Sequence, residues 1–515
     1  MADNSRSKNV GINVAAGLLA QILLLLLSFI GRTVFLKYLS VDYLGVNGLY
    51  SQILTVLSLA ELGLGNVMAY SLYQPIAEGD EGRIRSLLGA FKRLYLIIAA
   101  VIMGIGLALV PFLKYIIQSK LGQRELIIYY LIFLLSTSAS YLAAHKSACI
   151  KAHQEVYVTK KIDIISSLII HALQIVLIVA FRNYTLYLST LVLNALLNNF
   201  LVSRAVKKRY PRLLGKGEKV SLPERMISDN IRATFLYKIG ITALTKTDNI
   251  LISAMIGTAW VGYYSNYYMV VRAVQAYIDI IISSLMPSIG NLNTEGNREK
   301  SLGIFFAMLL FFHWCAAYGG ISLYLLFGDL IPLWLGPEYL LTSDTVLAIA
   351  FNFYIVNIVS PVWMFRETLG MFTRVKYLML EAAALNIAFS IVLGKLFGIA
   401  GILFATALSR ILTHIWYEPR ILFGEKLGGG LWRYWRTQFK YMGLTAVSFA
   451  LCYLISLYLP HTFLSMVAKG FIFMAVTLAV FAVGSYRSEE FIRLSEYAKF
   501  MLARLKRGCR VVLKH

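Results

Sequence analysis

Charged residues are scarce in this sequence. Of its 515 residues only 15% are charged, 58% are hydrophobic, and the mean hydropathy is +0.69. A soluble chain is typically about 25% charged and about 45–50% apolar. The low charge and high apolar content exclude intrinsic disorder, which needs the opposite composition. They also exclude an ordinary water-soluble globular protein, so the composition indicates an integral membrane protein.

Cysteine, histidine and recognisable catalytic motifs are also few. The four cysteines, at positions 149, 315, 452 and 509, match neither a disulfide framework nor a zinc pattern. The seven histidines are scattered, and the sequence has no H-E-x-x-H and no G-x-x-x-x-G-K-[ST] phosphate-binding loop. We therefore expect no metal, no cofactor, no built-in ATPase and no enzyme activity.

Acidic residues are about half as common as basic ones. Lys and Arg number 49 against 26 Asp and Glu, which gives a net charge of +23. Membrane proteins concentrate Lys and Arg in cytoplasmic loops, and this explains the excess better than a nucleic-acid partner. With the N-terminus in the cytoplasm, 36 of these residues fall on the cytoplasmic side and 7 on the opposite side. The asymmetry predicts that both termini are cytoplasmic.

Apolar runs of membrane-spanning length recur along the chain, since about 20 residues suffice for one helical span. We identify fourteen: 10–36, 44–72, 87–113, 126–150, 162–181, 186–206, 231–256, 259–286, 302–327, 345–365, 377–396, 398–417, 441–459 and 463–486. Runs of this length do not suit a β-barrel, whose strands are about 10 residues long and alternate in polarity. The predicted fold is an all-α integral membrane protein with about 14 transmembrane helices.

An internal repeat organises these runs. The segment Tyr43–Asn47 matches Trp260–Tyr264, Tyr50 matches Tyr267, and Glu78 matches Glu295, always 217 residues apart. Six runs separate the matched segments, so the halves are parallel repeats, as in transporters that rock two bundles about a central site. We expect six-helix lobes at 1–206 and 231–423, a basic cytoplasmic linker at 207–230, two additional transmembrane helices at 424–486 and a basic cytoplasmic tail at 487–515.

The most informative residues are the charges inside the apolar runs. Burying one costs about 2.5–3.5 kcal/mol on an insertion scale, so each is expected to face a cavity or a partner. The cations are Arg32, Arg232, Lys238, Lys246, Arg272 and Arg410, and the carboxylates are Glu61, Asp248, Asp279 and Glu381. Arg232 and Arg410 lie near predicted cytoplasmic ends, where their side chains can reach the membrane surface.

Helical spacing groups these charges with other polar residues into four stripes. The first, second, seventh and eighth runs carry them: Gly17, Gln21, Ser28 and Arg32; Ser51, Thr55 and Ser58 with Glu61 at the edge; Lys238, Thr242, Thr245 and Asn249 with Lys246 at the edge; and Tyr268, Arg272, Gln275, Asp279 and Ser283. Four stripes at equivalent positions of the repeat predict a water-filled cavity between the halves. Structural alternatives stay open: Arg272 could pair only with Asp279, and Asp248 could only neutralise a lysine.

The interior cations outnumber the carboxylates, which favours an anionic headgroup over a cationic drug. Pyrophosphate suits Arg, which binds phosphate through two parallel hydrogen bonds, and Lys, which binds it as a point charge. A polar cavity rich in aromatic residues also suits sugars. The lipid tail of such a substrate could stay in the bilayer while the headgroup crosses.

Two hairpins carry a family resemblance. Gly31–Leu36, Tyr43–Gly45 and Ser58–Gly65 in the first half, with Thr247–Ile252 and Val261–Tyr264 in the second, resemble bacterial polysaccharide repeat-unit flippases of the capsule and O-antigen type. These belong to the multidrug/oligosaccharidyl-lipid/polysaccharide (MOP) superfamily, and the resemblance covers essentially the whole chain. It implies movement of an undecaprenyl-pyrophosphate-linked oligosaccharide between leaflets of the bacterial cytoplasmic membrane.

The resemblance also implies site residues and partners. Arg32 matches a cavity arginine of the related lipid II flippases, whereas Thr33 replaces the acidic neighbour common there. The expected substrate-binding residues are Arg32, Lys238, Lys246, Arg272 and Gln275, with Glu61, Asp248 and Asp279 as counter-charge or coupling-ion candidates. The expected partners are the lipid-linked oligosaccharide, membrane lipids, and a polysaccharide polymerase with its assembly proteins. The alternatives are a cation-coupled multidrug exporter, a lipid II flippase and, disfavoured by the short outer loops, a membrane polymerase.

Overall fold

Helices make up nearly all of the computed structural model, which describes residues 23–58, 64–213, 229–294 and 296–496. None of these described residues lies in a β-strand. The chain divides into two compact units, Met1–Ser265 and Asn266–His515, and the division falls inside the long helix α12 (Thr258–Thr294). The all-α fold class predicted from the sequence is confirmed.

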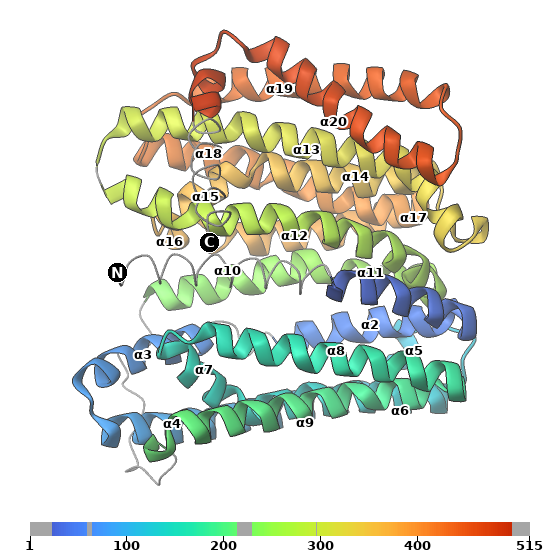
Figure 1. Ribbon diagram of the computed structural model, residues 1–515, viewed down its shortest axis with the longest axis vertical. Helices are drawn as coiled ribbons and strands as arrows, with labels where there is room; N and C mark the ends of the chain where they lie inside the picture. Colours follow the sequence, from blue (N-terminus) through green and yellow to red (C-terminus); the bar gives the residue numbers. More distant parts are fainter. Residues whose placement is uncertain (1–22, 59–63, 214–228, 295, 497–515) are drawn as a thin grey trace, which may run out of the picture. The chain divides into compact units, whose positions relative to one another are not determined.

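The first unit begins with a helix at residues 23–38 that carries Arg32. The helices that follow are α2 (Val41–Leu57), α3 (Leu64–Glu78), α4 (Glu81–Leu109), α5 (Leu113–Ile116), α6 (Gln123–Ser140), α7 (Ala144–Ala152), α8 (Val156–Phe181), α9 (Tyr184–Arg209), α10 (Asp229–Lys246) and α11 (Asp248–Met255). Helix α9 packs along α6 and α8 (Figure 1). Buried aromatic rings fill the core, with Tyr184 4.7 Å from Tyr43 and 4.8 Å from Tyr129 between ring centroids.

The second unit is built around α13 (Arg298–Trp334), and 72% of the residues in the most apolar part of this helix are buried inside the protein. The remaining helices are α14 (Ser343–Ile358), α15 (Ser360–Thr368), α16 (Phe372–Val375), α17 (Leu378–Leu412), α18 (His414–Glu425), α19 (Leu431–Leu457) and α20 (Phe463–Ser485). Helices α14, α19 and α20 all pack on α13 (Figure 1). Asp329 of α13 anchors α20 through an ion pair with Lys469, with 2.8 Å between Oδ2 and Nζ and both side chains almost completely buried.

The described residues contain ten helical segments that are long and apolar enough to cross a membrane. One of them, Phe372–Glu425, holds two predicted runs, because α17 reverses direction at Gly398 (φ 60°, ψ −137°). Asn386 donates to Thr406 across this hairpin. The runs 10–36, 44–72 and 231–256 correspond to shorter helices or extend beyond the described residues. The exact count of fourteen therefore stays a prediction.

The 217-residue repeat is visible in the local structure. Helices α2 and α12 begin at Val41 and Thr258, and α4 and α13 begin at Glu81 and Arg298, so both pairs keep that offset. The turns before α4 and α13 contain Gly79 and Gly296 at φ 71° and 70°, a left-handed conformation that favours glycine. The side chain of the next residue then caps each helix: Asp80 accepts from Arg83 N, and Asn297 accepts from Lys300 N.

Two repeat-equivalent glycines bring α2 and the start of α12 into close contact within the first unit. A Cβ added at Gly45 would lie 1.9 Å from the carbonyl oxygen of Thr258, and one added at Gly262 would lie 2.4 Å from that of Val41. Gly45 and Gly262 are 217 residues apart, and so are Val41 and Thr258. The crossing is therefore reciprocal, because each glycine lies against the backbone carbonyl of the first residue of the other helix.

Candidate functional site

Arg32 lies at a junction of three helices in the first unit. Its Nη1 donates a hydrogen bond to Ser265 Oγ of α12 at 2.8 Å. Tyr187 of α9 is close enough to interact electrostatically with the guanidinium, and it also hydrogen-bonds Asn47 of α2. The neighbouring Thr33 turns back to the Phe29 carbonyl of its own helix. Arg32 is thus in contact with two neutral polar side chains, one on α12 and one on α9.

The seventh predicted run is divided into α10 and α11, with Thr247 between them. Lys246 ends α10 and Asp248 begins α11, and both make polar contacts with other residues. Lys238, two turns earlier, makes no hydrogen bond or ion pair with any residue of the described ranges. Asn249 is buried against α2, where Gly48 leaves room for its amide. The structure therefore brings this polar stripe next to α2.

The polar stripe of α12 lies on an exposed to half-buried face of that helix. Gln275 Nε2 donates to Asp279 Oδ1 at 3.0 Å, which confirms that these two residues share a face. Arg272 and Asp279 are both exposed, and they form no ion pair with each other. The structural alternative in which Arg272 only neutralises Asp279 thus receives no support. Contact of a charged side chain with lipid hydrocarbon is costly, so the face of α12 that carries Arg272 and Asp279 is suited to water or a polar ligand.

Ser265, which receives the Arg32 hydrogen bond, begins the same row of α12. The spacing from Ser265 through Tyr268 and Arg272 to Gln275 and Asp279 alternates between three and four residues. Such spacing keeps side chains on one face of an α-helix. Ser265 is the last residue of the first unit, so the contact with Arg32 lies within that unit.

The other predicted charges are less informative. Glu61, Gly17 and Gln21 lie outside the described residues, as does the side chain of Arg232. Glu381 is exposed, and Arg410 makes polar contacts of its own. Within the described residues, no group of three or more His, Cys, Asp and Glu could hold a metal ion. Coordination of a coupling ion by such a group therefore finds no support in the described part of the chain.

Sequence reasoning missed two buried polar contacts in the second unit. Asn357 of α14 is completely buried and exchanges two hydrogen bonds with the Gln275 amide, at 3.0 and 3.3 Å. Arg366 of α15 pairs with Glu418 of α18, with 3.2 Å between Nε and Oε2. Each partner of the ion pair stands one residue beyond a predicted apolar run, at 365 and 417. Including the flanking residues of each run would have found them.

The sequence of this chain matches a known protein family. A family model described as polysaccharide biosynthesis protein matches residues 10–293, more than half of the chain. The chain belongs to this family. The match includes the first span, both hairpins that carried the resemblance and the α12 stripe, so the recognition made from the sequence is confirmed. No curated protein matches the chain by sequence.

Solved structures place this family member in the MOP fold. A lipid II flippase, MurJ, in an inward closed conformation superposes with a TM-score of 0.65 at 15% identity, covering 91% of this chain and 99% of that one. An inward-facing multidrug resistance transporter of the MATE family gives 0.57 at 12% identity, covering 77% and 94%. A MATE transporter from Vibrio cholerae gives 0.54 at 12% identity, covering 81% and 99%. The chain therefore shares the fold of these structures, and the apolar helices of its described residues make it a multi-pass membrane protein.

Proposed function

We propose that this protein is a flippase for undecaprenyl-pyrophosphate-linked oligosaccharide repeat units. It moves them from the inner to the outer leaflet of the bacterial cytoplasmic membrane, for surface polysaccharide biosynthesis. Membership of the polysaccharide biosynthesis family carries this proposal. The charge of the polar stripes supports it, because the interior of the apolar helices presents more cations than carboxylates.

In this proposal the cations hold the pyrophosphate and any acidic sugars. Lys238 and Arg272 form no ion pair within the described residues, so their charge is available to a ligand, and Arg32 adds a third cation to the set. Lys246 and Gln275 complete the substrate-binding set, and Glu61, Asp248 and Asp279 act as counter-charges or coupling-ion ligands. A cation exporter would need the reverse excess, because its ligand would have to be met by carboxylates.

Alternating access supplies the movement. In this proposal the close contact of α2 with the start of α12 is the gate on one side of the membrane, and its reciprocal geometry suits a transporter built from two similar halves. With both termini in the cytoplasm, this side is the outer one. The membrane potential or an ion gradient drives the cycle, since the sequence holds no phosphate-binding loop for ATP.

Deleting the gene tests the function directly. We expect lipid-linked repeat units to accumulate on the inner leaflet and surface polysaccharide to disappear, with both restored by the wild-type chain. The measurements are mass spectrometry of the lipid-linked pool and staining of the cell surface. Normal surface polysaccharide after deletion would contradict the proposal. Accumulation of lipid II with intact surface polysaccharide would favour the lipid II alternative, and drug sensitivity alone would favour a multidrug exporter.

A further inference from the structure

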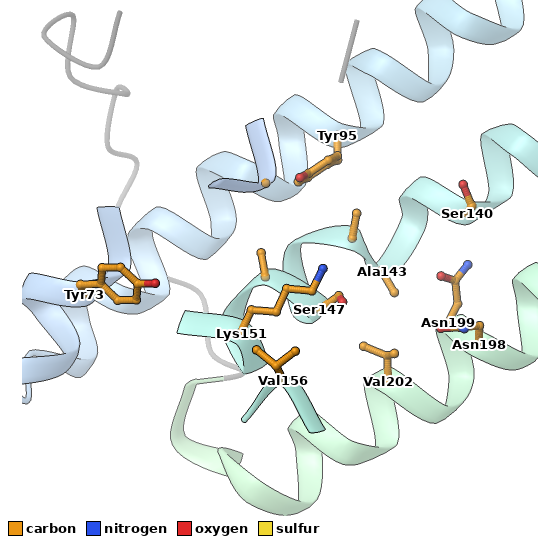
Figure 2. A pocket seen from close by; sticks show the side chains of 13 residues that line it. Tyr73, Tyr95, Ser140, Ala143, Ser147, Lys151, Val156, Asn198, Asn199 and Val202 are labelled. Atoms are coloured by element: carbon orange, nitrogen blue, oxygen red, sulfur yellow. The ribbon is translucent and has the colours of Figure 1, made fainter. Parts of the chain in front are cut away.

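The first unit contains a polar cavity whose described lining includes no residue of the predicted stripes. It has a volume of about 390 Å³, within the range of small-molecule pockets. Helices α3, α4, α7 and α9 supply most of its wall (Figure 2). The lining residues with hydrogen-bonding side chains are Tyr73, Tyr95, Ser140, Ser147, Lys151, Asn198 and Asn199. Apart from the buried Tyr95, these side chains are exposed or half-buried, so the cavity presents hydrogen-bonding groups that a polar ligand can reach.

Two asparagine side chains of the lining are oriented by one hydrogen bond each and retain a hydrogen-bonding atom that no described residue uses. Asn199 donates through Nδ2 to the Ala139 carbonyl at 2.7 Å, and Asn198 donates through Nδ2 to Asp163 at 2.8 Å. Neither amide oxygen makes a hydrogen bond within the described residues, so both are acceptors of set orientation. Fixing them in advance lowers the entropy cost of holding a ligand.

The donors come from α7. The Ser147 hydroxyl and the Lys151 ammonium make no hydrogen bond or ion pair with other described residues. Figure 2 shows the Lys151 side chain extending from α7 into the space toward Tyr95, with Asn199 on α9 across the cavity. Among the described residues that line the cavity there is no carboxylate, although Asp163 accepts from Asn198 beside it. The described lining therefore offers acceptors, a hydroxyl and the positive charge of Lys151.

The cavity lies near the basic end of α9. Asn199 precedes Arg209, the last residue of α9, by about 15 Å of helix. Arg209 in turn pairs with Glu155 at 2.9 Å, just after α7. The proposed orientation puts this end in the cytoplasm, where lipid-linked repeat units are assembled.

We propose that this cavity is a glycan subsite of the flippase, which takes one sugar ring carrying a single negative charge, such as a uronic acid or a phosphorylated sugar. Lys151 meets the charge, while Ser147, Asn198 and Asn199 bond the ring hydroxyls, each of which both donates and accepts. A pyrophosphate would call for several cations, whereas the described residues that line this cavity supply one, Lys151. The proposal rests on the proposed function and adds a specificity for acidic repeat units.

Substrate protection of a cysteine tests the site. In a full-length variant without native cysteines, Ser147→Cys is labelled by a charged methanethiosulfonate reagent in inside-out vesicles. The vesicles come from cells that make a repeat unit bearing a uronic acid, or from the same cells lacking the first glycosyl-phosphate transferase. We expect labelling at least 5-fold slower when the substrate is present. Lys208→Cys, exposed at the basic end of α9, is the matched control and is expected to label equally in both.

The outcomes separate a sugar from an ordinary lipid headgroup. Phospholipids are present in both vesicle preparations, so equally slow labelling in the two would assign the cavity to a phospholipid and overturn the proposal. Equally fast labelling would also overturn it. If Ser147→Cys does not reach the membrane, Ser140→Cys on the same cavity replaces it.

Export of two substrates gives the second test. We expect Lys151→Gln to lower export of an acidic repeat unit at least 10-fold and to keep export of a neutral repeat unit within 2-fold of the wild-type value. Lys151→Arg, which keeps the positive charge, is expected to retain most export of the acidic unit. An equal loss for both units would make Lys151 structural and overturn the assignment. Normal surface polysaccharide in the deletion strain would instead contradict the proposed flippase function itself. Failure of the glycan subsite and failure of the flippase function can therefore be told apart.

Discussion

At the residue scale, the polar groups of the apolar helices fall into two classes. Some are satisfied by a partner inside the bundle, as in the Arg366–Glu418 pair and the Gln275–Asn357 amide pair. Others, such as Arg272, are exposed on a helix face and form no ion pair among the described residues. The first class stabilises the fold, since removing one partner leaves a buried polar group unpaired. The second class is where a ligand can bind.

Arg272 tests this distinction. Arg272→Lys keeps the charge but loses the planar fork that makes two parallel bonds to phosphate. We therefore expect export of the lipid-linked substrate to fall at least 10-fold, normalised to protein in the membrane. The double change Arg272→Gln with Asp279→Asn is expected to stay inactive, because no ion pair between the two exists to be replaced. Full activity in the double variant would remove Arg272 from the binding set.

Sequence spacing predicted which residues share a helix face, and the Gln275–Asp279 bond confirms this for α12. It could not identify Asn357 or Ser265 as partners. An uncharged polar residue in an apolar run looks the same whether it faces a cavity, bonds its own backbone or meets another helix. That choice depends on packing between helices far apart in the sequence, such as the 82 residues between Gln275 and Asn357.

At the element scale, the repeat predicted more than the apolar runs did. The offset of 217 residues reappears in the starts of α2 and α12 and in the capped turns before α4 and α13. Hydropathy alone did not show the division of the fourth run into α6 and α7, since apolar residues continue through Tyr141–Ala143. At Thr247 the break falls among five consecutive polar residues, 245–249, but apolar residues on both sides kept it inside one predicted run. The packing of α10 and α11 on α2 also depends on tertiary contacts, so the lobe boundaries read from the repeat stay predictions.

The crossing of α2 and α12 gives a prediction at this scale. Gly45→Ala and Gly262→Ala each place a methyl group where a backbone oxygen already lies, 1.9 Å and 2.4 Å away. We expect each change to weaken the closed contact, to lower export at least 10-fold and to speed labelling of Asn47→Cys from outside the cell. Gly89→Ala in α4 is the control, because nothing lies within 4 Å of its added Cβ.

Two results would contradict this reading of the crossing. Wild-type export in both alanine variants would show that the helices can separate slightly at no functional cost. Unchanged labelling of Asn47→Cys would show that the crossing does not control access to the space beside Arg32. A fall in export for Gly89→Ala would mean that the assay reports general damage to the bundle.

At the scale of the whole molecule, orientation decides what the transporter does. The same cavity and charges would move a substrate inward or outward depending on which face meets the cytoplasm. The distribution of Lys and Arg, 36 against 7, is the observation that bears on it. The length of α9 allows the orientation to be tested. This helix runs unbroken from Tyr184 to Arg209, and its 26 residues span about 39 Å, which is longer than the hydrocarbon core of about 30 Å.

Cysteines at the two ends of α9 therefore must lie on opposite sides of the membrane. Arg182 precedes the helix and Lys208 stands in its last turn, and both are exposed. In intact cells carrying a chain without native cysteines, we expect an impermeant thiol reagent to label Arg182→Cys and to spare Lys208→Cys until the cells are permeabilised. The reverse pattern would invert the topology, place the basic end of α9 and the Lys151 cavity outside, and exclude entry of a substrate made in the cytoplasm through that cavity. Because the two positions stand at opposite ends of one continuous helix, their labelling must be opposite if α9 spans the membrane, and equal labelling would show that it does not.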